Sequence, residues 1–304
     1  EPSLTSGPKV AHFDRIEWRI IPDGGTAGAA LQAGEVDWWE QPTPDLLPLL
    51  RRNRNIEVTQ QDPVGLAGIL RFNCLHPPFD NPAIRRAILP AINQKDFMIA
   101  VNGDEPDAIR EGVGYFASIS PMASKAGLEV MKGDINAARA ALKAAGYKGE
   151  KVVLLVPSDI TYLNAEALMA LQTLRNMGMN VEPVTSDWAS IGARRAKRDA
   201  PDAGGWNMYV TVAGSFDADS PITNAYLSAS CGTSLPGWPC DKPLDELRVA
   251  WLKETNPARR KELLDKFHVQ AFNALPYIPV GQYTPAMAIR KEVKGVEKMW
   301  NGLP

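Results

Sequence analysis

The chain has 304 residues, which is long enough for two lobes, and 45% of its residues are hydrophobic and 22% charged. This is an ordinary globular composition and excludes a disordered chain. The formal net charge of −2 gives no basic excess for nucleic acid or an anionic membrane surface, and no apolar run is long enough to span a bilayer.

The first part of the chain predicts short strands alternating with short helices. Alternating apolar and charged residues predict a strand at 13–20, and Thr26 caps a predicted helix over 27–33 that ends at Gly34. Thr43, followed by a proline at the first helical position, predicts a second helix. Further extended segments are expected at 36–39, 56–62 and 65–75.

From residue 81 onward, helices and strands alternate regularly. A helical segment begins at Asn81 and is interrupted at Pro90, and an amphipathic helix runs from its cap at Asp134 to Gly146. Strands are predicted at 150–158, after the Gly178 stop up to residue 187, and at 204–214, with helices between them, two more helices at 243–256 and 257–275, and an extended end. This alternation favours an α/β lobe built from crossover units.

The loop "SASCGTSLPGWPCDKP" holds Cys231 and Cys240, and only Cys74 lies elsewhere. Their nine-residue spacing matches neither a C-x2-C metal pair nor a C-x-x-C redox motif, and the three histidines are scattered. We favour a disulfide over two free thiols, because the intervening prolines and glycines suit a tight turn. Such a staple contributes roughly 2–3 kcal/mol and implies an oxidising compartment. Cys74 is expected to be a buried small hydrophobe.

Four segments stand in a recognisable order along nearly the whole chain: "FDRIEWRIIPDGGTAGAALQAGEVDWWEQP", "LRFNCLHPPFDNPAIRRAILPAINQKDF", "DINAARAALKAAGY" and "YIPVGQY". Together they resemble the C-terminal part of the family 5 extracytoplasmic solute-binding proteins of peptide-type ABC transporters, which include dipeptide, oligopeptide and nickel binders. The stretch "PPFDNPAIRRAI" is the most specific part of the resemblance.

The resemblance implies an α/β, two-lobed, periplasmic-binding-protein-like clamshell that closes on a solute by hinge motion. Because family members are longer, it also implies a fragment, with one lobe complete and the other only partly present. Residues 1–73 are expected to be the later half of lobe one, ending in a hinge strand, residues 74–281 a complete lobe two, and residues 282–304 the return to lobe one. The expected hinge lies at Leu70–Asn73 and Val280–Tyr283.

The resemblance also points to one carboxylate. In the element "VAGSFDADSPITNAY", Asp217 falls where peptide binders of the family have an aspartate that holds the α-ammonium group of the peptide. The Gly-Trp pair of the family is replaced here by Ala213–Gly214, which leaves the ligand open. Alternatively, Asp217 and Asp219 are turn residues before Pro221.

Other candidate ligand contacts are aromatic or polar. Phe216 flanks the aspartate element, and Trp206 and Tyr209, three apart on a predicted strand, are expected to face opposite sides. One of them is a candidate to reach the cleft, although burial in the core is favoured for either ring. Trp238 stands in the stapled loop, which is expected to present it to the cleft. Asn73 lies at the predicted hinge and either contacts a solute or caps the strand end.

The resulting hypothesis is a solute-binding protein of an ABC importer, or its C-terminal fragment, that binds peptides or similar small solutes and delivers them to the permease transmembrane subunits. It is expected to be a periplasmic monomer, lipid-anchored if it is a lipoprotein, without cofactor, metal, nucleic acid or catalytic residues. No catalytic motif such as G-x-S-x-G or H-E-x-x-H is present in the sequence. An extracytoplasmic α/β hydrolase and a binding-protein homologue repurposed as a sensor remain alternatives.

Overall fold

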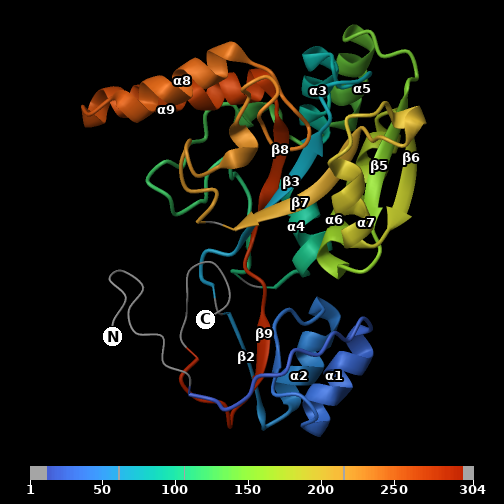
Figure 1. Cartoon of the computed structure of the whole chain (residues 1–304), viewed down its shortest axis with the longest axis vertical. Coiled ribbons are helices and arrows are strands. Elements are labelled where there is room, and N and C mark those ends of the chain that lie inside the picture. Colours follow the sequence, from blue (N-terminus) through green and yellow to red (C-terminus); the bar gives the residue numbers. More distant parts are fainter. Residues whose placement is uncertain (1–11, 61, 106, 215, 297–304) are drawn as a thin grey trace.

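The computed structural model describes residues 12–60, 62–105, 107–214 and 216–296, and their strands form two separate sheets (Figure 1). A three-stranded antiparallel sheet has, in order, β1 (Trp38–Trp39), β9 (Met287–Arg290) and β2 (Ile56–Thr59). A six-stranded sheet has, in order, β4 (Ile109–Arg110), β8 (Tyr277–Tyr283), β3 (Leu66–Phe72), β7 (Met208–Gly214), β5 (Lys151–Pro157) and β6 (Asn180–Ser186). We call the parts built on these sheets the small lobe and the large lobe.

The directions of the strands give the large lobe one distinctive edge. Strand β5 runs parallel to β6 and β7, whereas β3 runs antiparallel to β7 and β8. Four strands, β5, β6, β7 and β8, therefore end at the edge where β3 begins, and this edge points toward the small lobe (Figure 1). We call it the facing edge.

Helices cover both faces of the six-stranded sheet. They are α3 (Pro82–Arg86), α4 (Gln94–Asn102), α5 (Ile135–Ala144), α6 (Thr161–Asn176), α7 (Trp188–Arg195), α8 (Lys242–Lys253) and α9 (Pro257–Ala274). Helices α4 and α6 pack together on one face, where the main hydrophobic core lies, and α7 packs on the other. Helices α8 and α9 form an antiparallel pair at the end of the large lobe remote from the small lobe (Figure 1).

Local signals explain where most of these helices begin and end. Asp134 accepts the Ala137 N–H at 2.9 Å and starts α5, as predicted. The predicted interruption at Pro90 is also confirmed, because this residue lies in a separate 3₁₀ turn between α3 and α4. The alternation of helices and parallel strands between 135 and 214 is therefore the expected crossover architecture.

The small lobe packs two helices, α1 (Gly24–Ala33) and α2 (Leu47–Arg52), on the three-stranded sheet, as Figure 1 shows. Helix α1 ends at Gly34, which has a φ of 79°, as predicted. Its cap is Asp23 rather than Thr26, since the Asp23 carboxylate accepts the Thr26 N–H at 2.7 Å. The helix therefore begins three residues earlier than the sequence pattern indicates.

The predicted strand at 13–20 does not form. Residues 13–20 belong to neither sheet, and Trp18 and Ile20 are 73% and 94% exposed. Alternation of apolar and charged residues specifies a strand only where a neighbouring strand supplies ladder hydrogen bonds and covers the apolar face. No described strand pairs with this segment.

The chain crosses between the two sheets at positions that differ from those predicted from the sequence. Strand β3 pairs with β7 along its whole length, and β8 pairs with β3, so both belong inside the large lobe. The chain passes from one sheet to the other between the end of β2 at Thr59 and the start of β3 at Leu66, and again between β8 and β9. The expected hinge segments, Leu70–Asn73 and Val280–Tyr283, and with them the expected lobe boundaries at 73 and 282, therefore lie within the large lobe, where cross-strand pairing holds them in the sheet.

Candidate functional site

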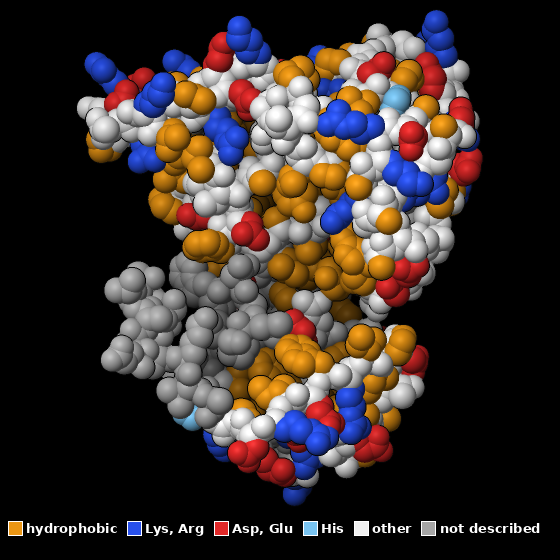
Figure 2. Space-filling model, in the orientation of Figure 1, with side chains coloured by type: hydrophobic (Ala, Val, Ile, Leu, Met, Phe, Trp, Pro, Cys, Tyr) orange, Lys and Arg blue, Asp and Glu red, His pale blue; other side chains and the backbone are white. Residues whose placement is uncertain are grey.

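A hollow separates the facing edge of the large lobe from the small lobe. Figure 2 shows this hollow with many hydrophobic side chains on its walls. In the large lobe, α6 and α7 begin directly after the ends of β5 and β6, at the same edge. Crevices at the carboxyl ends of parallel strands are the usual ligand sites of open α/β sheets. The hollow is therefore the first place to look for a solute.

A cluster of polar side chains lies behind the facing edge. Glu166 on α6 is fully buried, and its Oε1 accepts the N–H of Ile69 on β3 at 3.1 Å. Tyr283, at the end of β8, is 2% exposed, and its ring centre lies 6.4 Å from that of Tyr162 in the first turn of α6. Among the described residues, Glu166 Oε2 and the Tyr283 hydroxyl have no hydrogen-bond partner.

Burial and nearby carboxylates shift the pKa values of this cluster. Burial raises the pKa of the Glu166 carboxyl well above its usual range, and the bond from the Ile69 N–H offsets this only in part. Burial also raises the pKa of Tyr283, with Tyr162 and Glu166 adding to the effect. The pKa of Tyr162 is raised by burial and then by the carboxylates of Glu40 and Glu166. Glu40 follows β1, so a small-lobe charge acts on a large-lobe side chain.

Sequence reasoning missed Glu166 and Glu40. The available signal for Glu166 was its place on the apolar face of α6, three residues after Leu163 and four before Ala170, both of which are buried. A carboxylate in such a stripe is either paired or functional. Glu40 offered no comparable signal, because its effect on the pKa of Tyr162 depends on how the two lobes are placed.

The predicted aspartate element does lie at the facing edge. Phe216 is 61% exposed and Asp217 is also exposed, both in the turn that follows the end of β7. Asp219 is half-buried, and its backbone carbonyl accepts a hydrogen bond from the Ser120 hydroxyl at 2.8 Å. These three residues remain candidates for solute contact, with Phe216 and Asp217 the more accessible.

Tyr209 and Trp238 belong to the core instead. The rings of Trp206 and Tyr209 do not face opposite sides but lie 5.0 Å apart in one cluster. The reason is that Trp206 precedes β7, so the alternation of side chains along the strand does not apply to it. Trp238 is 6% exposed and lies 6.0 Å from the Trp206 ring. The prediction that the stapled loop presents Trp238 to a cleft was wrong, since the ring anchors the loop to the sheet.

Asn73 caps the end of β3. It is fully buried, its Nδ2 donates to the Trp206 carbonyl at 2.8 Å, and its Oδ1 accepts the Leu75 N–H at 3.1 Å. These bonds use its side chain at the end of the sheet remote from the hollow. Of the two readings of Asn73, the structure therefore supports backbone capping.

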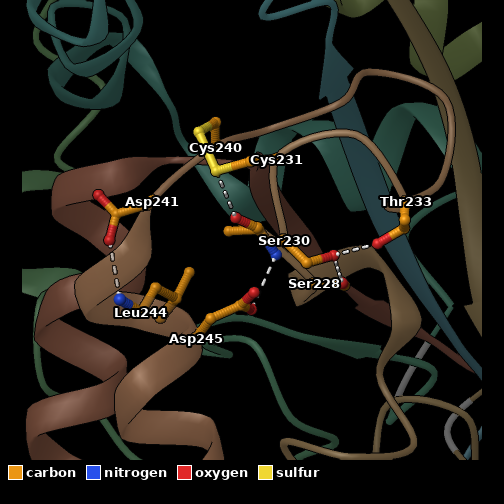
Figure 3. Close-up of a disulfide and its surroundings, with 9 residues drawn as sticks. Ser228, Ser230, Cys231, Thr233, Cys240, Asp241, Leu244 and Asp245 are labelled. Carbon is orange, nitrogen blue, oxygen red and sulfur yellow. Dashed lines mark hydrogen bonds between the residues drawn. A yellow bond between two sulfur atoms is a disulfide. The ribbon is translucent and has the colours of Figure 1, made fainter.

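The predicted Cys231–Cys240 disulfide is present (Figure 3). Next to it, Ser230 and Cys240 form an antiparallel bridge, so the two arms of the loop are also held by backbone pairing. The buried Arg71 of β3 fastens the same loop, donating to the carbonyls of Pro236 at 2.9 Å and Leu235 at 3.3 Å. The loop is thus a rigid support of the large lobe.

Cys74 is half-buried rather than fully buried. Its N–H donates to the Gly237 carbonyl at 2.8 Å, which adds a further tie to the stapled loop. Burial raises the pKa of its thiol, and the nearby Arg85 and Arg71 offset this only in part. The thiol is therefore poorly ionised at neutral pH, as expected for a structural cysteine.

Two further hollows lie elsewhere on the molecule. One, of about 270 Å³, lies where the lobes meet, and its lining includes Arg51 of α2 and Glu105 of the large lobe. These two side chains form a bidentate ion pair across the lobes, at 2.6 and 3.0 Å. The other, of about 310 Å³, is lined by Cys74, Arg85 and Cys240 and lies beside the disulfide.

Within the described ranges, no helix is both long enough and apolar enough to cross a bilayer. The same ranges hold no group of three or more His, Cys, Asp or Glu side chains placed to bind a metal ion.

Comparison with known families now identifies the architecture. The family model of the bacterial extracellular solute-binding proteins, family 5, matches residues 6–235. The chain belongs to this family. It is 30% identical, over 99% of its length, to a probable peptide ABC transporter periplasmic-binding protein of Sinorhizobium fredii, and it covers 58% of that relative. With the di/tripeptide-binding protein 1 of Pseudomonas aeruginosa it shares 27% identity over 94% of the chain and 52% of the relative.

The fold is that of periplasmic binding proteins. The structure of the binding protein DppA of Helicobacter pylori, in complex with the peptide STSA, superposes with a TM-score of 0.77 at 21% identity. It covers 92% of this chain and 53% of that one. The chain therefore has the mixed α/β fold expected from the sequence. It spans about half the length of the relatives that it matches. It corresponds to a partial clamshell.

Proposed function

We propose that this protein binds a peptide or similar small solute in the hollow between its lobes and delivers it to an ABC permease. Membership of family 5 is the observation that carries the proposal. The relatives named above are described as peptide or di/tripeptide binders, which favours a peptide as the ligand. The comparisons offer no support for a hydrolase.

The strand connections support a clamshell mechanism. Among the described strands, the chain passes between the sheets only from β2 to β3 and from β8 to β9, and paired short crossings of this kind are where binding proteins bend. On this proposal the large lobe is the complete lobe two, and the small lobe is the part of lobe one that this chain supplies. A solute that contacts both lobes would favour the closed form, and the closed form would dock on the permease.

The family is extracellular, and we place the protein in the periplasm as a monomer that is lipid-anchored if it is a lipoprotein. The Cys231–Cys240 disulfide supports this placement, because disulfides persist in oxidising compartments. On this proposal the protein carries out no covalent chemistry and needs no cofactor.

Titration calorimetry and thermal unfolding of the natural full-length protein with di-, tri- and tetrapeptides test the proposal. A peptide at 100 times its Kd should stabilise the folded protein by roughly 2.7 kcal/mol. Replacing Asp217 by Asn should weaken binding about 10-fold or more if its carboxylate holds an ammonium group. The matched control is Glu246→Gln on α8, an exposed carboxylate far from the hollow. The absence of binding by any peptide would refute the function.

A further inference from the structure

The two connections between the lobes touch each other where they leave the large lobe. We call the connection from β2 to β3 the first crossing and the connection from β8 to β9 the second crossing. Gly65, directly before β3, has a φ of 80°, and a side chain at this position would collide with the Tyr283 carbonyl oxygen at the end of β8. Only glycine fits so close an approach of two backbones. The crossings therefore leave the large lobe side by side.

Arg110 of β4 holds both crossings with one guanidinium group. Its Nη2 donates to the Pro63 carbonyl at 3.0 Å and its Nη1 to the Val64 carbonyl at 3.3 Å, both on the first crossing. Nη1 also donates to the hydroxyl of Thr284, on the second crossing, at 3.1 Å. The Arg110 side chain is half-buried, and Thr284 is 1% exposed. A planar fork of several fixed donors suits such a bridge, whereas a lysine ammonium lacks this geometry.

Other hydrogen bonds tie the same two segments to the large lobe. The Thr284 N–H donates to the carbonyl of Ala108, directly before β4, at 2.7 Å. The fully buried Gln282 side chain donates to the Val64 carbonyl and accepts the Ser118 N–H at 2.9 Å. The large-lobe ends of both crossings are therefore fixed, and bending is left to the small-lobe side of these contacts.

We propose that Arg110 is a positioning residue for lobe closure, which couples the two crossings so that they bend as one hinge. We call Arg110 with Pro63, Val64 and Thr284 the hinge clamp. This inference rests on the proposed function, in which the lobes close on a solute. Hinge residues absorb large changes of φ and ψ, so two crossings give one bending axis only if their ends keep a fixed relation. Without the guanidinium group, each crossing takes up its own backbone angles, and fewer arrangements of the lobes are competent to bind.

The Arg51–Glu105 ion pair joins the lobes in a different way. It links the two lobes directly, and its side chains are 47% and 21% exposed. Ion pairs at such exposure contribute little to a conformational equilibrium and are screened by salt. Arg110 acts instead on the backbone of the connections, through neutral acceptors, and so determines how the crossings move rather than how strongly the lobes attract each other.

Pulsed electron resonance of the full-length protein without solute tests the inference. Spin labels at Glu35→Cys in the small lobe and Ala189→Cys at the start of α7, both exposed positions, report the distance between the lobes. A Cys74→Ser background leaves only the two new thiols to be labelled. We expect Arg110→Met to widen the distribution of distances roughly twofold, because more arrangements of the lobes become populated. Arg52→Met, at an exposed arginine that ends α2, is the matched control and should leave the distribution unchanged.

Two further variants test the geometry of the hinge clamp. Thr284→Val removes the hydroxyl that accepts from Arg110 at almost constant volume, so it should also widen the distribution, by less than Arg110→Met. Arg110→Lys keeps the charge without the fork and should resemble Arg110→Met. In Arg110→Met, hydrogen exchange in fragments that cover 62–66 and 282–286 should be faster by about 10-fold or more, because these segments open more often. Unfolding curves establish that each variant is folded. Wild-type distributions in both Thr284→Val and Arg110→Lys overturn the clamp.

Peptide titration of the same variants separates a hinge clamp from a solute contact. The clamp predicts that Arg110→Met binds peptides roughly 3- to 10-fold more weakly and also has the wider distances without solute. Weaker binding with unchanged solute-free distances would make Arg110 a solute contact and overturn the clamp. Unchanged distances overturn it whatever the peptides do. If no peptide binds any variant while the distances widen as expected, the proposed function fails and the coupling of the crossings stands.

Discussion

His268 should make the stability of the large lobe depend on pH. Its ring, on α9, is fully buried against Tyr115 and Phe116, with ring centres 6.0 and 4.8 Å away. Neither ring nitrogen has a hydrogen-bond partner of good geometry among the described residues. Burial lowers the pKa of His268 to about 4, and the Met122 backbone and the Asp265 carboxylate offset this only in part.

The sign and size of the effect follow from linkage. In the unfolded chain this histidine gains a proton below its ordinary pKa of 6.5, whereas in the folded protein it stays neutral until about pH 4. The unfolded state therefore binds more protons in this window, and stability falls as the pH falls. The full loss is on the order of 3 kcal/mol, of which about 2 kcal/mol is lost between pH 7.5 and pH 5.

Urea unfolding at pH 7.5 and pH 5 measures this loss. The drop in the free energy of unfolding should be about 2 kcal/mol smaller in His268→Leu and in His268→Gln than in the wild type. The two substitutions differ in packing and hydrogen bonding, so their absolute stabilities will differ, but both remove the titrating ring. An equal drop in the wild type and both variants would refute the assignment of the pH dependence to His268.

Three further predictions concern stability, each read from urea unfolding. Replacing Cys231 and Cys240 together by serine should lower the free energy of unfolding by roughly 2–3 kcal/mol, and dithiothreitol should then have no further effect; a variant as stable as the oxidised wild type contradicts this. Glu166→Gln keeps an acceptor for the Ile69 N–H and should stabilise the protein at pH 7.5. The reason is that a carboxyl whose pKa is higher in the folded than in the unfolded state costs stability as the pH rises. A less stable variant would contradict the claim that burial raises the pKa of Glu166. Arg71→Leu leaves several loop carbonyls unpaired and should cost roughly 3 kcal/mol or more, so a change under about 1 kcal/mol would show that the loop does not depend on it.

The local part of the fold was predictable from the sequence. Asp134, Pro90 and Gly34 act within a few residues of their own positions, so their effects on helix ends could be read without a partner. The segment 13–20 could not be judged in this way, since a strand exists only with its neighbour. The crossings from β2 to β3 and from β8 to β9 were misplaced for the same reason, because sheet membership is a long-range property.

The site was predictable only in part. The match to the family placed Asp217, with Phe216 beside it, and both lie at the facing edge. Trp238 was misjudged because a ring in a Gly/Pro loop suggests exposure, whereas Arg71 and the disulfide pull that loop onto the sheet. Glu40 raises the pKa of Tyr162 from more than a hundred positions away in the sequence, and no local pattern reports such an effect.

Hydrogen–deuterium exchange of the natural full-length protein, with and without a bound peptide, tests most directly the claim that the solute lies between the lobes. Binding should slow exchange at the facing edge, in proteolytic fragments that cover 158–162 and 216–219, and in the small lobe around 38–42. Slowed exchange confined to α3 and α9, around the hollow beside the disulfide, with the facing edge unchanged, would contradict it.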